Sequence, residues 1–257
     1  MNYLEIGQSF VERCGYISRL GGLKSAFRQA TQSMGFRYFA CLSHIDPLRP
    51  PNSAVILHTY PRRWIKYVSE NRIDRIDPVY CHANRTLQPF FWTDKEFLDG
   101  LTNKQKKVME KAAEFGLHSG FTVPIHAPCP LPASCTVIPK RAQRNDKHGE
   151  NPVRYVAVYL MAVYLHETAG RIINKQFVRD HPRPKLTPQE QRCLRYVALG
   201  KSDWAIAKIL GLSPSTVHHH IEAAKRRLGT ATRVQAVVEA LYDQQLSFHD
   251  VIGALDE

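Results

Sequence analysis

The sequence lacks a hydrophobic run long enough to cross a membrane. Its longest uninterrupted apolar stretch covers the eleven residues 155–165, whereas about 20 are needed to span a bilayer as a helix. The first residues also lack a basic segment followed by an apolar one, and Glu5 is acidic, so we expect no secretory signal. No membrane partner is therefore expected, and a cytoplasmic location is the default.

Signatures of catalysis and metal binding are also missing. There is no Gly-rich phosphate loop, no His-Glu-x-x-His motif and no Cys-x-x-Cys pair. The six cysteines are scattered, which in a reducing compartment is typical of free and mostly buried thiols. An irregularly spaced group of His126, Cys129, Cys135 and His148 leaves zinc binding as a weaker alternative. We expect no enzyme, no catalytic residue, no metal and no cofactor.

Acidic residues are few relative to basic ones. Asp and Glu together number 23 against 35 Lys and Arg, which gives a formal charge of +12. This imbalance favours an anionic partner, and in a chain without a membrane span the preferred partner is nucleic acid. With 257 residues, 44% of them hydrophobic, the chain is long enough for one or two domains with buried cores.

The first 140 residues combine helical and extended patterns. A helix is expected over 22–34, where apolar residues recur at helical spacing, and two more are expected where Thr93 with Glu96, and Thr102 with Gln105, fit a capping box. Strands are predicted for the β-branched and aromatic runs 36–42, 54–58, 121–126 and 134–138. The first two runs are separated by a Pro-rich turn, so a hairpin is likewise expected.

A polar, basic loop at 140–150 precedes Asn151 and Pro152, which are typical of a helix start. The helix that follows is predicted to run from Val153 to about Asn174. It is so apolar that it needs a partner surface, either the sheet or a second subunit. Residues 179–185 then combine charge with two prolines, which indicates an extended linker and a domain boundary.

The C-terminal segment predicts four short helices. Thr187-Pro188-Gln189-Glu190 places Thr, Pro and Glu at the N-cap, N1 and N3 positions of the first. Ser202 caps the second, Gly211 ends it, and Ser213-Pro214 opens a third that runs to Leu228. A fourth is expected over 233–242. Two short helices joined by a tight Gly-containing turn form a helix-turn-helix.

Charge favours DNA as the partner of this segment. Residues 185–235 carry nine Lys or Arg and three acidic residues, whereas 236–257 carry five acidic residues and no Lys or Arg. In a helix-turn-helix the third helix enters the major groove. The residues expected to read bases are His218, His219 and Glu222. The residues expected to contact phosphates or to sit at helix starts facing DNA are Thr187, Ser202, Ser213, Ser215, Thr216, Lys225 and Arg226. The alternative is a helical bundle with a solvated basic face.

These helices carry a family resemblance. The blocks that resemble the LuxR/GerE-type DNA-binding domain are Leu186-Thr187-Pro188-Gln189-Glu190, Gly200-Lys201-Ser202, Ile206-Ala207-Lys208-Ile209-Leu210, Ser213-Pro214-Ser215-Thr216-Val217 and Lys225-Arg226-Arg227-Leu228-Gly229. They cover about the last quarter of the chain. Trp204 stands where the family usually has a smaller or polar residue, and His218-His219 is an unusual reading pair, so the operator sequence stays open.

The N-terminal part resembles the autoinducer-binding domain of LuxR-type quorum-sensing regulators. The resemblance rests on Tyr60-Pro61-Arg62-Arg63-Trp64, Asp77-Pro78-Val79, Pro89-Phe90-Phe91-Trp92 and Gly116-Leu117-His118-Ser119-Gly120. It implies an α+β protein: an α/β/α sandwich with an antiparallel sheet around an acyl-homoserine lactone, followed by an all-α four-helix helix-turn-helix domain. The domains would be 1–174 and 186–257, joined by the linker 175–185. The implied partners are the signal, double-stranded DNA, a second subunit and RNA polymerase.

The resemblance also implies roles for individual residues. The Trp64 indole would donate to the lactone carbonyl, Asp77 would accept the ligand's amide N–H, and Tyr60 would donate to the acyl carbonyl. Trp92 would stack against the lactone ring, with space left by Gly120. The further residues expected at the ligand are Tyr67, Val68, Pro78, Ser134 and Thr136. Such aimed polar groups suit an apolar signal, because unmatched polar atoms in a dry cavity are costly.

One position departs from the family pattern. The family usually has Tyr four residues after the tryptophan, whereas this chain has Val68 there and Tyr67 one position earlier, on a different helix face. The acyl portion could then be bulkier or differently substituted, or the ligand could be something other than a homoserine lactone. A second alternative is a regulator that binds DNA with no small molecule, its cavity filled by its own side chains.

Overall fold

The computed structural model describes residues 2–45, 53–126, 132–140, 151–180, 185–247, 249 and 251, with only the backbone of 176–180. The chain divides into two compact units, Met1–Asp180 and His181–Glu257. Each unit has its own hydrophobic core. The Pro-rich turn 46–52, most of the segment 128–132 and the basic loop 141–150 lie outside the described residues.

The N-terminal unit is built on a five-stranded sheet with the order β2-β1-β5-β4-β3, and every neighbouring pair is antiparallel. The strands are β1 (Phe36–Ser43), β2 (Ile56–His58), β3 (Phe90–Phe91), β4 (Phe121–Ile125) and β5 (Ala133–Pro139). The predicted hairpin is confirmed by the pairing of β1 with β2. The two-residue β3 was not predicted, because a run that short carries no periodicity.

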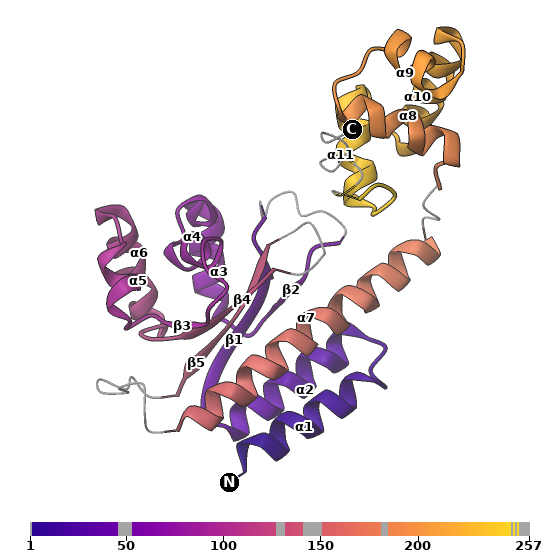
Figure 1. Cartoon of the computed structure of the whole chain (residues 1–257). Helices are drawn as coiled ribbons and strands as arrows, with labels where there is room; N and C mark the ends of the chain where they lie inside the picture. The colour runs from indigo at the N-terminus through magenta and orange to yellow at the C-terminus, as the bar shows by residue number, and fades with distance from the viewer. Residues whose placement is uncertain are drawn as a thin grey trace. The chain divides into compact units, whose positions relative to one another are not determined.

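Helices cover both faces of this sheet, so the predicted α/β/α sandwich is confirmed (Figure 1). One face is covered by α1 (Tyr3–Cys14), α2 (Leu20–Ser33) and α7 (Pro152–Asp180). Phe27 is central to this layer, because its ring packs edge-on against Phe10 of α1 and Phe39 of β1. The layer packs α1 closely on α7: a Cβ added at Gly7 would lie 3.4 Å from the Ala157 Cβ.

The other face carries short helices and a second apolar core that includes Trp64 and Trp92. These elements are α3 (Arg62–Glu70), the 3₁₀ turn η1 (Ile73–Arg75), α4 (Pro78–Ala83), α5 (Lys95–Asp99) and α6 (Asn103–Glu114). The capping box of α6 at Thr102 is confirmed. The one at Thr93 is wrong: the N-cap of α5 is Asp94, whose Oδ2 accepts a 2.7 Å hydrogen bond from the Phe91 N–H. The carboxylate thus closes the preceding turn.

Helix α7 begins at Pro152 as predicted but ends at Asp180, six residues beyond the expected Asn174. It therefore occupies the first half of the predicted linker; residues 181–184 lie outside the described part of the chain. By length and composition its segment Pro152–Lys175 could cross a bilayer, yet half of the most apolar 18 residues of this segment are buried inside the unit. Core packing on the sheet and α1 thus accounts for one side of its apolar character.

The C-terminal unit contains the four predicted helices, α8 (Pro188–Ala198), α9 (Asp203–Leu210), α10 (Pro214–Leu228) and α11 (Arg233–Tyr242). The side chains of Thr187, Ser202 and Ser213 cap the first three as expected, and Gly211 and Gly229 end α9 and α10 in the left-handed conformation. The turn between α9 and α10 is therefore the tight turn of a helix-turn-helix.

Glu190 of α8 forms an ion pair with α10. Its side chain is 2% exposed, closes the capping box with Thr187, and forms an ion pair with Arg227, whose Nε lies 3.1 Å from Oε2. The sequence assigned Glu190 only to the cap, because a contact across 37 residues has no local signal.

Candidate functional site

A partly enclosed cavity of about 70 Å³ lies between the sheet and the layer of short helices. Apart from Tyr67 and Gly120, every residue predicted to contact the ligand lines it: Tyr60, Trp64, Val68, Asp77, Pro78, Trp92, Ser134 and Thr136. The remaining walls are mostly apolar, among them Leu42, Ile65, Met109 and Leu117. The cavity therefore combines a mostly apolar lining with a few polar groups, the composition typical of small-molecule sites.

Trp64 presents an unused donor at this cavity. Its side chain comes from α3 and is 6% exposed. Within the described part of the chain, no group accepts a hydrogen bond from its indole Nε1, and an indole N–H can only donate. Tyr67 stacks on the outer side of the same ring, with centroids 5.8 Å apart, and so supports Trp64 instead of lining the cavity. Val68 takes the cavity-facing position.

Asp77 presents an acceptor. As the N-cap of α4, its Oδ1 accepts the backbone N–H groups of Val79 and Tyr80 at 2.8 and 3.2 Å. No described group hydrogen-bonds to Oδ2, the second carboxylate oxygen. Burial raises the pKa of Asp77 from its ordinary 3.8 to about 6, against the opposing effect of the two backbone N–H groups. The carboxylate is thus desolvated but held in place by the helix that it caps.

Tyr60 supplies a second donor. Burial raises the pKa of its hydroxyl well above the ordinary value, and the nearby Asp77 carboxylate adds to the shift. Tyr60 therefore keeps its proton throughout the physiological range. The side chain of Thr136, on β5, has a smaller effect in the opposite direction and lowers the pKa.

Trp92 contacts the cavity only through its rings. Its Nε1–H donates to the Thr122 hydroxyl at 3.0 Å, and Thr122 lies 2.9 Å from the Thr136 hydroxyl. Gly120 is required by this packing: a Cβ at that position would approach the Trp92 ring to 2.7 Å. Gly120 thus makes room for Trp92 and not directly for a ligand. Thr122 had no sequence signal, since it is a buried residue of an apolar strand.

Ser134 also lines the cavity, and its hydroxyl is hydrogen-bonded to a residue that the sequence did not indicate. Its Oγ lies 2.8 Å from His44 Nε2, and His44 Nδ1 lies 2.6 Å from the Asn84 Oδ1. The imidazole stacks on Tyr80 with centroids 4.3 Å apart. His44 and Ser134 are 90 residues apart in sequence, so only the sheet brings them together.

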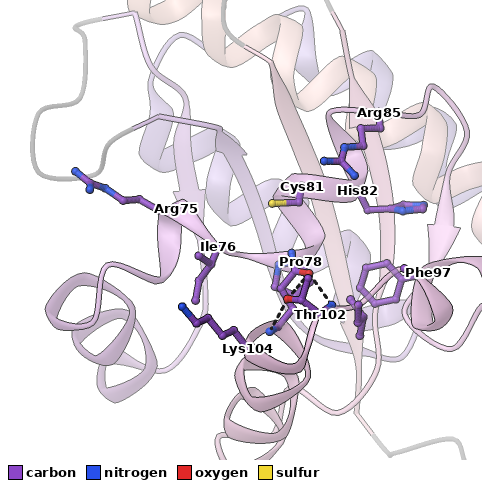
Figure 2. Close-up of a pocket in the computed structure, with 12 residues that line it drawn as sticks. Arg75, Ile76, Pro78, Cys81, His82, Arg85, Phe97, Thr102 and Lys104 are labelled. Atoms are coloured by element: carbon purple, nitrogen blue, oxygen red, sulfur yellow. Dashed lines mark hydrogen bonds between the residues drawn. The ribbon is translucent and has the colours of Figure 1, made fainter.

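A second hollow is larger, about 320 Å³, and lies on the outer side of α4. Its rim includes Arg75, Arg85 and Lys104, but Figure 2 shows their side chains extending in different directions around it. Polar groups that recognise one ligand converge on it. The smaller cavity, where donor and acceptor groups face a partly enclosed and mostly apolar space, is therefore the better candidate for a ligand site.

In the C-terminal unit, α10 carries the predicted base-reading residues. His219 is exposed. The His218 side chain is already engaged within the unit, because its Nδ1 lies 3.2 Å from Asp203 Oδ2. Arg233 of α11 donates to the same carboxylate at 2.9 Å. Glu222 pairs with Lys225 at 2.8 Å. Of these groups, His219 is thus the one most available to a base edge.

The predicted phosphate-contacting hydroxyls gather at helix starts. Ser213 Oγ accepts the Thr216 N–H at 3.1 Å and lies 2.8 Å from the hydroxyls of Ser215 and Thr216. Thr187 and Ser202 cap α8 and α9. Arg226, near the end of α10, is exposed. A cap hydroxyl beside free backbone N–H groups at a helix start is suited to a phosphate.

The residues of the alternative zinc group do not form a cluster in the described part of the chain. His126 Nε2 lies 3.0 and 3.1 Å from the Ala83 and Thr86 carbonyl oxygens, and Cys135 is fully buried on the central strand β5. Cys129 and His148 lie outside the described residues.

A cavity in an α/β/α unit, followed by a helix-turn-helix unit, is the organisation expected of a transcriptional regulator that binds a small molecule. Residues 20–169 match the family described as "Autoinducer binding domain", and residues 184–240 match "Bacterial regulatory proteins, luxR family". The chain belongs to the LuxR family of autoinducer-binding transcriptional regulators and is not an enzyme.

The chain is similar over most of its length to several known transcriptional regulators. The transcriptional activator BjaR1 of Bradyrhizobium diazoefficiens is 27% identical over 90% of this chain and 92% of its own. The quorum sensing-dependent regulator RpaR of Rhodopseudomonas palustris is 33% identical over 71% of each chain. The crystal structure of Escherichia coli SdiA matches 92% of this chain and 95% of its own with a TM-score of 0.72 at 20% identity, which supports the fold.

Proposed function

We propose that the chain is a quorum-sensing regulator that binds an N-acyl homoserine lactone in the cavity of its N-terminal unit and an inverted-repeat operator as a dimer. The observation that carries the proposal is that one mostly apolar cavity is lined by both an unused donor, Trp64 Nε1, and an unused acceptor, Asp77 Oδ2. An acyl-homoserine lactone offers the complementary carbonyl and amide N–H.

Each cavity group then has a role. Trp64 donates to the lactone carbonyl, Asp77 accepts the amide N–H, and Tyr60 donates to the acyl carbonyl. Trp92, Pro78 and Val68 provide apolar contact. The test is extraction of small molecules from protein expressed in its native host, followed by mass spectrometry. Recovery of a stoichiometric acyl-homoserine lactone is expected; extracts without any bound small molecule would contradict the proposal.

Signal affinity should fall in acid because of Asp77. Its pKa of about 6 lies above the ordinary 3.8, so the ligand-free folded state binds this proton more tightly than the unfolded chain does. The contribution of Asp77 to the free energy of unfolding is therefore lost as the pH rises from about 4 to 6. A ligand amide favours the charged carboxylate instead. We expect affinity to be about tenfold lower at pH 5 than at pH 7.5, measured by calorimetric titration. An equal pH dependence in Asp77→Asn would exclude this carboxylate as the cause.

A second candidate ligand is an acyl compound without a lactone. One solved SdiA structure holds octanoyl-rac-glycerol, and it matches 94% of this chain with a TM-score of 0.69. Val68, at the position where the family usually has Tyr, supports a changed polar lining. Alkaline treatment followed by acidification separates the candidates. Alkali opens a homoserine lactone ring, which closes again in acid and restores the signal. Alkali cleaves an acyl glycerol to a fatty acid and glycerol, and acidification does not restore that ester.

The remaining alternative is a regulator that needs no ligand. Limited proteolysis with and without organic extract of the host tests it. A ligand that binds only the folded state protects that state from unfolding, so protection by extract supports sensing. Equal digestion in every extract would favour the ligand-free alternative.

The dimer is proposed to form through the outer side of α7. Apolar side chains there recur at helical spacing and are 40–58% exposed: Val153, Val156, Leu160 and Val163. This stripe lies opposite the side that packs on the sheet, and a second copy would bury it. Two helix-turn-helix units would then read half-sites about one DNA turn apart.

Operator recognition is proposed to divide between His219 and Arg226 of α10, which are both exposed. His219→Ala should change the preferred base at one step of each half-site. Arg226→Ala should weaken all sequences alike, with a shallower dependence on salt, because a phosphate contact carries no sequence information. Lys225→Ala should resemble Arg226→Ala. Binding to a randomised operator library measures both effects; identical profiles for the variants would show that the groove assignment is wrong.

RNA polymerase is the further proposed partner. The relative BjaR1 is a transcriptional activator, and activation would require contact with the polymerase. Trp204 and Ile209 of α9 are 68% and 49% exposed, an unusual exposure for large apolar side chains that suits a protein contact. Trp204→Ala should keep operator affinity within about twofold and reduce transcription at least fivefold in a reconstituted assay, the scale of one lost apolar contact. Unchanged transcription would remove Trp204 from the proposed contact.

A further inference from the structure

We infer that His44 makes Ser134 a hydrogen-bond acceptor toward the cavity, and that the cavity thereby selects a signal that brings a hydroxyl donor in addition to its amide N–H. The inference rests on the proposed function and names the subclass of signal: an acyl chain with a hydroxyl near the amide. His44 is then a positioning residue that acts on specificity through Ser134.

The imidazole of His44 is fixed on three sides. Directly after β1, its ring stacks on Tyr80 of α4, with centroids 4.3 Å apart and an interplanar angle of 20°. Nδ1 lies 2.6 Å from Oδ1 of Asn84, the C-cap of α4, and Nε2 lies 2.8 Å from Oγ of Ser134 on β5. Both ring nitrogens are therefore committed, and the ring cannot rotate without losing the stack.

The protons in the hydrogen bonds that join Asn84, His44 and Ser134 can be assigned one by one. Burial lowers the pKa of His44 to about 4, so the ring is neutral and carries a single N–H. An amide oxygen can only accept, which places that proton on Nδ1, facing Asn84 Oδ1. Nε2 is then the acceptor, and Ser134 donates its only proton to it. Toward the cavity Ser134 presents lone pairs alone.

The cavity is consequently lined by two polar groups that can only accept from a ligand, Ser134 Oγ and Asp77 Oδ2, whereas the hydroxyls of Tyr60, Tyr80 and Thr136 can also donate. An acyl-homoserine lactone with a plain or oxo-substituted chain has one donor, its amide N–H. A buried acceptor left without a donor is costly, and a keto oxygen placed against it is worse. A hydroxyl on the third carbon supplies the missing donor, and that carbon is only two bonds from the amide carbonyl. Ser134 is 3% exposed, so a ligand that fills the cavity must supply this donor itself.

The test compares N-(3-hydroxyoctanoyl)- and N-(3-oxooctanoyl)-homoserine lactone by calorimetric titration of the full-length protein. Wild type should bind the hydroxy signal about tenfold more tightly. In His44→Phe the ring still stacks on Tyr80 but accepts nothing, so the Ser134 proton turns to the ligand and the preference should vanish or reverse. His82→Phe, a matched control at an imidazole that packs against Phe90 and Phe97 and does not line the cavity, should keep the preference.

Equal affinity of wild type for the two signals, or an unchanged preference in His44→Phe, would overturn the inference. Nitrogen-15 NMR of the wild-type imidazoles tests it without any variant: His44 should be neutral with its proton on Nδ1, and a proton on Nε2 would overturn it. N-octanoyl-homoserine lactone is the third probe. Binding of all three lactones without preference defeats this inference alone, whereas binding of none defeats the proposed function as well.

Discussion

Asp77→Asn should lower signal affinity at least about a hundredfold and leave the fold intact. The carboxylate is the one charged acceptor of the cavity, and a charge-assisted hydrogen bond contributes roughly 1.5–3 kcal/mol. The asparagine Oδ1 can still accept the Val79 and Tyr80 N–H groups, so α4 keeps its cap. Its Nδ2 then directs a donor at the ligand's amide N–H. Calorimetric titration measures the loss.

Two controls separate recognition from folding in this experiment. The melting temperature of ligand-free Asp77→Asn should equal or exceed that of wild type at pH 7.5, because a desolvated charge has been removed. Asp74→Asn changes a neighbouring carboxylate that pairs with Arg72 outside the cavity, and it should keep signal affinity. Wild-type affinity in Asp77→Asn would mean that the ligand's amide is held elsewhere.

Leu160→Glu should convert the protein to a monomer and reduce operator affinity at least about a hundredfold. Leu160 is 41% exposed near the middle of the apolar stripe of α7, where a carboxylate from each subunit would be buried next to its equivalent. A monomer reads one half-site and loses the gain from linking two reading units, which is commonly hundredfold or more. Analytical ultracentrifugation and operator titration measure the two effects.

Leu160→Met is the matched control, since it keeps an apolar side chain of similar volume and should remain dimeric. The side chain points away from the Val158, Met161 and Leu165 core, so neither variant should unfold the N-terminal unit. A dimeric Leu160→Glu protein would place the subunit contact on another surface.

Local chemistry determined which parts of the fold could be predicted. The first three C-terminal helices begin at Thr187, Ser202 and Ser213, and Gly211 and Gly229 end α9 and α10, so these boundaries are encoded within a few residues. Two of the short helices on the other unit's cavity side lack such local signals: α3 has no side-chain cap, and in α5 Asp94 took the place expected for Thr93 through a contact with the Phe91 backbone.

The cavity was only partly visible in the sequence. Trp64 and Asp77 stand in motifs that carry the family resemblance, and both line the cavity. His44 and Thr122 do not line it but hold residues that do, through hydrogen bonds to Ser134 and Thr136. Contacts of this kind depend on strand register, here Leu42 opposite Ser134 and Ala40 opposite Thr136. Nothing within one segment specifies them.

The central claim is that a signal bound between Trp64 and Asp77 stabilises the N-terminal unit. Thermal unfolding of wild type and Asp77→Asn in a saturating acyl-homoserine lactone tests this claim most directly. At a hundred times Kd, ligand adds about 2.7 kcal/mol to the folded state, so wild type should melt roughly 5–10 °C higher and Asp77→Asn should hardly move. Equal shifts in the two proteins, or no shift in wild type with any lactone tried, would contradict the account.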